Sequence, residues 1–282
     1  MTVRDKFNEL VETISSIYDF REANNIVSII FEDAFGINLI SQDNFPEKHL
    51  SKWDEYKRRL LTHEPFQYIL EEADFYGLKF KVNPSVLIPR PETEELVYWV
   101  EQWASTSKSI QILEIGTGSG CIAITLAKQL SNAKVTAIDV SENALSVAME
   151  NAKLNDVDVL FSKLDILDDD RVTQFFDNKN YHLIASNPPY IPKKESTLMR
   201  KNVLDFEPSL ALFVENHNPL IFYQKITKLG TEILEKNGIL IFEINENLGD
   251  DIYKMMEDYG YKNIEIIQDI HQKNRMVKGE WL

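Results

Sequence analysis

From residue 110 onwards, short apolar segments alternate with helical patterns, and few folds can accommodate that order. Apolar segments predict seven strands, at residues 110–115, 134–139, 157–163, 181–186, 239–245, 261–268 and about 275–278. Helical patterns separate several of them, at residues 119–130, 141–154 and 220–235. Strands that are joined through helices form a parallel sheet with helices on both faces. The sequence therefore predicts a doubly wound α/β domain with a mainly parallel, seven-stranded sheet.

The first 74 residues have a different character. They contain a single glycine, Gly36, and apolar residues recur at three- and four-residue steps, as at Phe7, Leu10 and Ile14. That spacing is typical of short packed helices. Apolar and polar residues then alternate over 75–82, which indicates a short hairpin. We expect a helical bundle at 1–74, a β-hairpin linker at 75–90 and the α/β domain at 91–282.

Composition and charge exclude several classes of protein. No stretch approaches the roughly 18 uncharged apolar residues of a membrane span, and Asp5 and Glu9 interrupt any signal-peptide core. The single cysteine, Cys121, cannot form an intramolecular disulfide. We therefore expect a cytoplasmic protein. A net charge of −15 repels a phosphate backbone, which makes nucleic acid a less favoured partner.

Metal-binding patterns are missing from the sequence. The five histidines show no ligand spacing and are interpreted as structural or surface residues: His49, His63, His182, His217 and His271. The acidic run 165–170 lacks the spacing of a calcium loop and is expected to be a solvated turn. We expect no metal site.

The segment ILEIGTGSG, residues 112–120, lies where the first predicted parallel strand turns into a helix. Gly116, Gly118 and Gly120 lack side chains, and the helix N-terminus behind them should present unpaired N–H groups to a ligand. Cys121 stands where the dinucleotide fingerprint has its third glycine, so NAD is disfavoured. The loop predicts a nucleoside-type site, with a purely structural tight turn as the alternative.

Two acids flank this loop. Asp139 closes the second predicted strand, where its carboxylate could accept hydrogen bonds from ribose hydroxyls; alternatively, it caps the next helix together with Ser141. Glu114 lies inside the first strand, where a charge needs a partner, so we interpret it as facing or supporting a ligand. Because the loop has no Lys or Arg, an adenosine cofactor without a diphosphate fits best, and S-adenosylmethionine is the commonest one.

The segment Asn187, Pro188, Pro189, Tyr190 follows the fourth predicted strand. Loops beyond the carboxyl ends of parallel strands form the binding crevice, so this segment should face the glycine loop. The Asn187 side-chain oxygen and the Pro188 carbonyl could accept both hydrogens of an NH2 group and leave its lone pair for a methyl donor. Tyr190 offers a flat face to a planar amide or base. The alternative is an ordinary turn.

NPPY after a G-x-G-x-G loop resembles the amino-group methyltransferases that use S-adenosylmethionine. Further segments resemble one branch of them: EPFQYILEEADFYGLKF at 64–80, VLIPRPETEELV at 86–97, ILEIGTGSGCIAI at 112–124 and FEPSLAL at 206–212. That branch is the PrmC/HemK family of peptide chain release factor glutamine methyltransferases. The resemblance runs from about residue 64 to 245.

The resemblance implies a Rossmann-like methyltransferase domain at 91–282 that methylates the side-chain amide nitrogen (N5) of the glutamine in the Gly-Gly-Gln motif of class I release factors. S-adenosylhomocysteine would be the other product. The implied substrate-amide residues are Asn187, Pro188, Pro189 and Tyr190. The implied cofactor-binding residues are Glu114, Gly116, Thr117, Gly118, Ser119, Gly120, Asp139, Asp165, Ile166 and Asn187. We expect the helical region 1–74 to recognise the release factor and the segment 89–92 to shape the cleft, without direct nucleic-acid or membrane binding.

Four departures from the family pattern concern the shapes of loops. Glu71 and Pro219 occupy positions where glycine is frequent, the pair at 214–215 replaces a glycine-containing turn, and Asn245 stands where glycine is expected. Two other functions stay open. An N6-adenine DNA or RNA methyltransferase would use the same NPPY segment on a flipped base, against the net charge, and a non-catalytic module would keep only the fold. Cytosine-C5 chemistry is excluded because the only cysteine belongs to the glycine loop.

Overall fold

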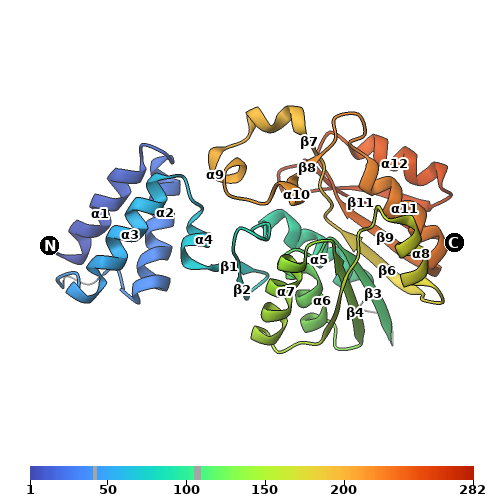
Figure 1. The fold of residues 1–282 in the computed structure, drawn as a ribbon, viewed down its shortest axis with the longest axis horizontal. Coiled ribbons are helices and arrows are strands. Elements are labelled where there is room, and N and C mark those ends of the chain that lie inside the picture. Colours follow the sequence, from blue (N-terminus) through green and yellow to red (C-terminus); the bar gives the residue numbers. More distant parts are fainter. Residues whose placement is uncertain (41–42, 105–108) are drawn as a thin grey trace. The chain divides into compact units, whose positions relative to one another are not determined.

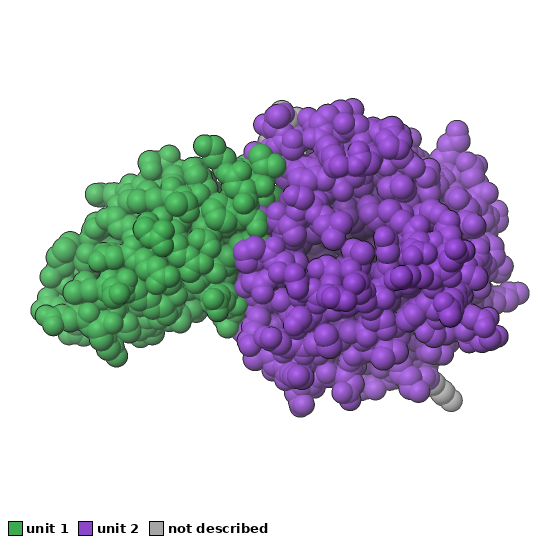
Figure 2. All heavy atoms as spheres, viewed as in Figure 1, with its two compact units in different colours: residues 1–73, 200–206 green, residues 74–199, 207–282 purple. Residues whose placement is uncertain are grey.

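A computed structural model describes residues 1–40, 43–104 and 109–282. Two compact units make up the chain (Figure 2). Unit 1 contains Met1–Ala73 together with Arg200–Phe206, and unit 2 contains Asp74–Met199 together with Glu207–Leu282. Within the described residues, no helix is long and apolar enough to cross a membrane.

Unit 1 is helical (Figure 1). Its elements are α1 (Val3–Ile14), α2 (Phe20–Ile29), a π-helical turn (Ile30–Ala34), a 3₁₀ turn (Glu47–His49), α3 (Leu50–Leu61), α4 (Phe66–Leu70) and α9 (Lys201–Leu204). Thr2 begins α1 with a capping box that it completes with Asp5, and the Asp19 side chain caps α2. The core of the unit centres on Phe31, whose ring lies 5.6 Å from that of Trp53 in an edge-on arrangement.

The segment 200–206 joins unit 1 although it is distant in sequence. Within that unit the Arg200 guanidinium lies 3.4 Å from the Glu22 carboxylate. The sequence analysis assigned these residues to the α/β domain, because nothing in their local pattern distinguishes them from the residues on either side.

Unit 2 is built on a seven-stranded sheet in the order β10-β11-β9-β6-β3-β4-β5. The strands are β3 (Ile110–Ile115), β4 (Ala133–Asp139), β5 (Val159–Lys163), β6 (Tyr181–Ser186), β9 (Leu234–Glu243), β10 (Lys262–Gln268) and β11 (Asn274–Trp281). The pairs from β9 through β6, β3 and β4 to β5 are parallel, whereas β11 runs antiparallel to both β9 and β10. The predicted fold class, a doubly wound and mainly parallel sheet, is confirmed.

Helices cover both faces of this sheet. The helices of one side are α5 (Pro91–Ala104), α6 (Cys121–Gln129) and α7 (Glu142–Leu154); those of the other are α8 (Asp169–Phe176), α11 (Ile221–Ile233) and α12 (Gly249–Asp258). Successive residues of a strand enter opposite cores: Ile112 packs in the first and Leu113 in the second. This is why the predicted strands read as continuous apolar runs.

The connections between these elements contain several short segments. They are β1 (Glu72–Phe75), β2 (Leu78–Lys81), β7 (Ile191–Pro192), a 3₁₀ segment (Lys193–Leu198), α10 (Ser209–Leu212) and β8 (Phe213–Val214). Strands β1 and β2 form a two-stranded sheet around Tyr76 and Gly77, which have φ angles of 51° and 73°, as a tight hairpin turn requires. The buried Asn151 of α7 bonds both the N–H and the carbonyl of Lys81 in β2, and the carbonyl of Ser119 in the glycine loop. The hairpin, α7 and the glycine loop are therefore held together.

The acidic run at 165–170 was expected to be a solvated turn, and for its second half this is wrong. The Asp168 side chain accepts a hydrogen bond from the Arg171 N–H and caps α8, which begins at Asp169. Acidic residues favour the first turn of a helix because its N-terminal end carries a partial positive charge.

Candidate functional site

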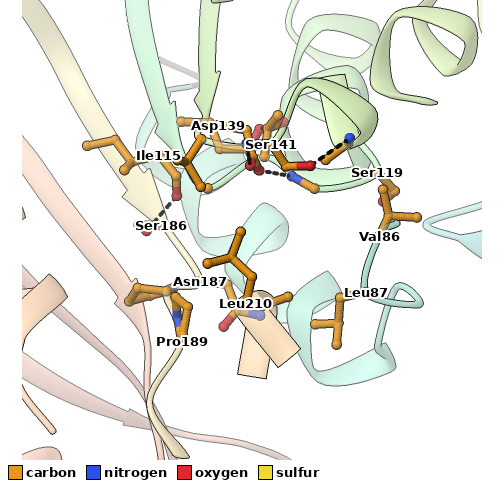
Figure 3. Close-up of a pocket in the computed structure, with 18 of the residues that line it drawn as sticks. Val86, Leu87, Ile115, Ser119, Asp139, Ser141, Ser186, Asn187, Pro189 and Leu210 are labelled. Carbon is orange, nitrogen blue, oxygen red and sulfur yellow. Dashed lines mark hydrogen bonds between the residues drawn. The ribbon is translucent and has the colours of Figure 1, made fainter. Parts of the chain in front are cut away.

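One cavity of unit 2 lies at the carboxyl ends of β3, β4 and β6 (Figure 3). Its wall is formed by the segment 85–90 with Thr93, the glycine-loop residues 114–119 with 121–122, the segments 138–141, 164–166 and 186–189, and by Ala144, Pro208, Leu210, Ala211, Phe222 and Ile226. In Figure 3, Asp139 and Ser141 lie on one side of the cavity, and Asn187 and Pro189 lie on the other. The glycine loop and the Asn-Pro-Pro segment, which are distant in sequence, therefore share one cavity.

Positive backbone angles shape the glycine loop. Gly116 and Gly118 have φ angles of 81° and 55°, and a Cβ atom built at either position would meet no atom within 4 Å. Glycine is required there for the backbone angles, and the open space beside these residues belongs to the cavity.

Hydrogen bonds within unit 2 occupy several amides of the glycine loop. The N–H groups of Gly116 and Thr117 both donate to the carbonyl of Ile138, and that of Gly120 donates to the carbonyl of Thr117. The amide of Gly118 donates to Asp139 at 2.8 Å. The loop uses these four amides to fix its own shape. Unpaired N–H groups were expected at the helix N-terminus behind the glycines, and for Ala123 in the first turn of α6 this is wrong, because its N–H donates to Glu114.

Gly120 does not line the cavity. A Cβ atom built on it would lie 2.7 Å from Cδ1 of Ile124 and 3.1 Å from Cβ of Ala148. Its φ is 82°, at the start of α6. The absence of a side chain at this third glycine therefore allows α6 and α7 to pack closely.

Asp139 ties the glycine loop to the strand that follows it. One carboxylate oxygen accepts from Gly118 and the other accepts from the Ser141 N–H at 2.9 Å, while the Ser141 side chain caps α7. Burial raises the pKa of Asp139, against the opposing effect of these amides. A carboxylate has about four acceptor positions, so the Asp139 carboxylate retains acceptor capacity after these bonds.

Glu114 is buried at the end of β3, with 1% of its surface exposed. One oxygen accepts from the Thr117 hydroxyl at 2.6 Å and from the Ala123 N–H at 3.1 Å. The other has no hydrogen-bond partner within the described part of the chain. Burial raises the pKa of this carboxyl to about 7. A buried acceptor without a partner on a cavity wall suits a ligand that brings a cation or a donor.

The Asn-Pro-Pro segment follows β6 directly. Asn187, Pro188 and Pro189 line the cavity, whereas Tyr190 does not. Tyr190 packs against the core cluster that contains Tyr223, and burial raises the pKa of its phenol to about 12. The expected stacking surface for a substrate is therefore not part of this cavity wall.

Behind Asn187 stand two residues that the sequence analysis did not single out. The Asn187 side-chain nitrogen donates to the Thr93 hydroxyl at 3.4 Å, and that hydroxyl donates to the Glu243 carboxylate at 2.6 Å. Glu243 is the last residue of β9 and is 4% exposed. A charged residue at the buried end of a predicted strand was the available signal, the same one that identified Glu114.

An ion pair holds the segment 85–90 of the cavity wall. Arg90 lies 2.5 Å from Glu207, whose other oxygen accepts from the N–H of Ile88 at 3.3 Å. The Glu207 side chain is 1% exposed, so the pair lies at the inner side of this wall. It connects the segment that precedes α5 to the one that precedes α10.

The last two predicted cofactor residues, Asp165 and Ile166, also line the cavity. Asp165 is exposed and accepts from the Leu167 N–H, and Ile166 is buried. In the described residues there is no group of three His, Cys, Asp or Glu side chains that could hold a metal ion. Of the predicted site residues, Gly120 and Tyr190 alone lie outside the cavity wall.

Comparison with known proteins gives consistent matches. The family model described as methyltransferase small domain matches residues 98–205. A release factor glutamine methyltransferase from Flavobacterium psychrophilum is 43% identical over 286 residues, which cover 99% of each chain. One from Bacteroides thetaiotaomicron is 46% identical over 271 residues, 94% of this chain and 95% of that protein.

Solved structures share the fold at low sequence identity. The 16S rRNA N2 G1207 methyltransferase (RsmC) of T. thermophilus, in complex with AdoMet and guanosine, superposes with a TM-score of 0.54 and 13% identity over 75% of this chain and 50% of that one. A putative SAM-dependent methyltransferase from Streptococcus mutans gives a TM-score of 0.51 and 14% identity over 74% and 55%. These structures show the methyltransferase fold, and the identity to the curated relatives over nearly the whole chain shows that this protein belongs to the release factor glutamine methyltransferase family.

Proposed function

We propose that the enzyme transfers a methyl group from S-adenosylmethionine to the side-chain amide nitrogen (N5) of the glutamine in the Gly-Gly-Gln motif of class I release factors, in the cytoplasm. The observation that carries the proposal is the cavity that joins the glycine loop to Asn187, Pro188 and Pro189. Such a cavity has one end suited to a nucleoside and another suited to an NH2 group.

The residues of the first end fit S-adenosylmethionine, which supplies an electrophilic methyl group when bound. Asp139 keeps acceptor positions for ribose hydroxyls, and the partnerless oxygen of Glu114 can accept from the ammonium group. Asp165 adds a third acid, whereas Arg90 on the same wall is neutralised by Glu207. An acidic wall favours a cationic cofactor over an anionic one. Thr117, Ser119 and Ile166 would complete its surroundings.

The second end fits a primary amide. The Asn187 oxygen and the Pro188 carbonyl can each accept one hydrogen of the glutamine NH2 group, which fixes the nitrogen in the cavity. Prolines have no N–H, so this stretch of backbone offers acceptors without competing donors.

Positioning does most of the work in this site. The amide lone pair is delocalised, and the acids of the cavity wall lie in β3, in β4 and after β5, not in the segment 186–189. Among the described lining residues there is no histidine or lysine to act as a base. Asn187 and Pro188 would align the nitrogen for in-line displacement, and water can take the proton after the new N–C bond has formed.

We further propose that unit 1 recognises the release factor away from Gly-Gly-Gln. None of the residues described for this unit lines the cavity. An enzyme that selects one glutamine of a folded protein gains from contacts remote from the reacting atom, because their binding energy supports turnover.

Incubation with labelled S-adenosylmethionine tests the proposal. Label should enter a release factor that carries Gly-Gly-Gln, and not one with Gly-Gly-Asn, while duplex DNA should stay unlabelled. Intact release factor should give a kcat/KM well above that of a short Gly-Gly-Gln peptide. Labelled adenine in the DNA would support the rival N6-adenine activity, and equal kcat/KM for protein and peptide would refute the role of unit 1.

A further inference from the structure

Three residues from three elements form a chain of hydrogen bonds that ends at the cavity wall. Asn187 follows β6, Thr93 lies in the first turn of α5, and Glu243 ends β9. The Asn187 nitrogen lies 3.4 Å from the Thr93 hydroxyl, which lies 2.6 Å from a Glu243 oxygen. Thr93 is 3% exposed and Glu243 is 4% exposed, so water competes little for either bond.

The chemistry of these groups gives the chain a direction. An ionised carboxylate only accepts hydrogen bonds, so the Thr93 hydroxyl must donate its one hydrogen to Glu243. Thr93 then presents lone pairs to Asn187. The Asn187 amide has a donor end and an acceptor end, and only the donor end can face Thr93.

The orientation of Asn187 decides what it can offer a substrate. With its NH2 group held by Thr93, its oxygen is left for another donor. A flipped amide would place its own NH2 group against the NH2 group of a glutamine, where two donors repel and neither is satisfied.

We propose that Glu243 and Thr93 are positioning residues that hold the Asn187 side chain with its oxygen toward the NH2 group of the substrate. This inference rests on the proposed function, in which Asn187 accepts from that group. Neither residue needs to touch the substrate nitrogen, since both act through Asn187.

The surroundings of Glu243 allow this chain of hydrogen bonds to respond to pH. Burial raises the pKa of Glu243 to about 7, while Thr93, Arg275 and Asn187 favour the ionised form. The titratable and charged groups around it are Glu92, Cys121, Tyr190, Tyr223 and Arg275. Once protonated, Glu243 can donate to the Thr93 oxygen, and the Thr93 hydroxyl can then donate its hydrogen to the oxygen of a flipped Asn187 amide.

Variants of Thr93, Asn187 and Glu243 and a matched control test the proposal, with kcat measured at saturating cofactor and affinity for S-adenosylmethionine measured by calorimetry. Thr93→Val removes the hydroxyl at nearly constant volume, and Thr93→Ser keeps it. Thr125→Val is the control, because the Thr125 hydroxyl is buried and has no partner within the described residues. Asn187→Ala removes the side chain that Thr93 and Glu243 are proposed to position.

Thr93→Val should lower kcat about 10- to 100-fold, the usual effect of removing a group that orients a functional side chain. Cofactor affinity should stay within about twofold, and Thr93→Ser and Thr125→Val should keep most of the wild-type rate. In the Asn187→Ala background, Thr93→Val should lower kcat hardly any further, because both substitutions interrupt the same chain of hydrogen bonds. Wild-type kcat should rise with pH through about 7, and Glu243→Gln should flatten that rise.

Three outcomes separate the possible failures. The positioning role is refuted if Asn187→Ala lowers kcat but Thr93→Val behaves like Thr125→Val. It is also refuted if the losses in kcat caused by Asn187→Ala and Thr93→Val multiply in the double variant. In both cases the proposed function stands. If Asn187→Ala itself turns over at the wild-type rate, the proposed substrate clamp fails. If Thr93→Val does not fold, Glu243→Gln decides: an unchanged kcat and pH profile would refute the inference.

Discussion

Replacing Asp139 with alanine tests the nucleoside end of the cavity. The carboxylate accepts two backbone amides, from Gly118 at 2.8 Å and Ser141 at 2.9 Å, and retains acceptor positions for the ribose. Hydrogen bonds to a charged group contribute about 1.5–3 kcal/mol, so affinity for S-adenosylmethionine should fall about 10- to 150-fold. Calorimetric titration measures this change directly.

The same substitution leaves two amides without their acceptor, and this sets its cost in stability. Gly118 and Ser141 are both half-buried, so water can replace part of what they lose. A loss of about 1–2 kcal/mol lowers the Tm of a domain of this size by roughly 2–8 °C. The variant should therefore be folded at room temperature, with the circular dichroism spectrum of the wild type.

Asp168→Ala is the matched control. Asp168 also accepts a backbone N–H at the start of a helix, from Arg171, but does not line the cavity. It should lose stability to a similar degree and keep its cofactor affinity. An unchanged dissociation constant for Asp139→Ala, or an equal loss in both variants, would refute the assignment of Asp139 to the ribose.

Three further predictions concern other residues of the site. Asn187→Ala should lower methyl transfer by roughly 10²- to 10³-fold in a radiolabel assay and spare cofactor affinity, by analogy with deleting one preorganised contact. Burial raises the pKa of Glu114 from its ordinary value of 4.5 to about 7, so the unfolding free energy of the cofactor-free protein should fall as pH rises from about 4.5 to 7. Cofactor affinity should rise through about pH 7, and Glu114→Gln should weaken both trends in urea titrations and calorimetry. Gly120→Ala should destabilise the protein by about 1–3 kcal/mol in thermal unfolding, more than Gly36→Ala, which strains a similar φ in open space.

Most of the fold could be predicted from local patterns in the sequence. The apolar runs over β3, β4 and β6 and the glycines between β3 and α6 follow from rules that act within a few residues, so a single sequence reveals them. The C-terminal end of the sheet was harder to predict, because β11 is 8 residues long where about four were expected, runs antiparallel and lies between β10 and β9. Which strands β11 pairs with, and in which direction, depends on long-range contacts.

Site residues could be predicted where the residue type itself indicates a function. They could not be predicted where the role of a residue depends on tertiary packing. The acids Glu114 and Asp139 are conspicuous at strand ends, and both line the cavity. Gly120 looks the same as Gly116 in sequence, and only the positions of Ile124 in α6 and Ala148 in α7 show that it lies where the two helices pack together. Thr93 and Glu243 are 150 residues apart, so no local rule connects them.

The segment 200–206 has a consequence for synthesis on the ribosome. Residues 1–73 emerge first, yet the unit to which they belong also contains Arg200–Phe206, which follow more than a hundred residues later. Domains generally fold as units during synthesis, the N-terminal one first. The unit that contains residues 1–73 therefore has all its residues only after most of the sheet has been translated. The nascent chain thus acquires its two units nearly together, and a ribosome stalled before residue 200 would hold an incomplete version of both.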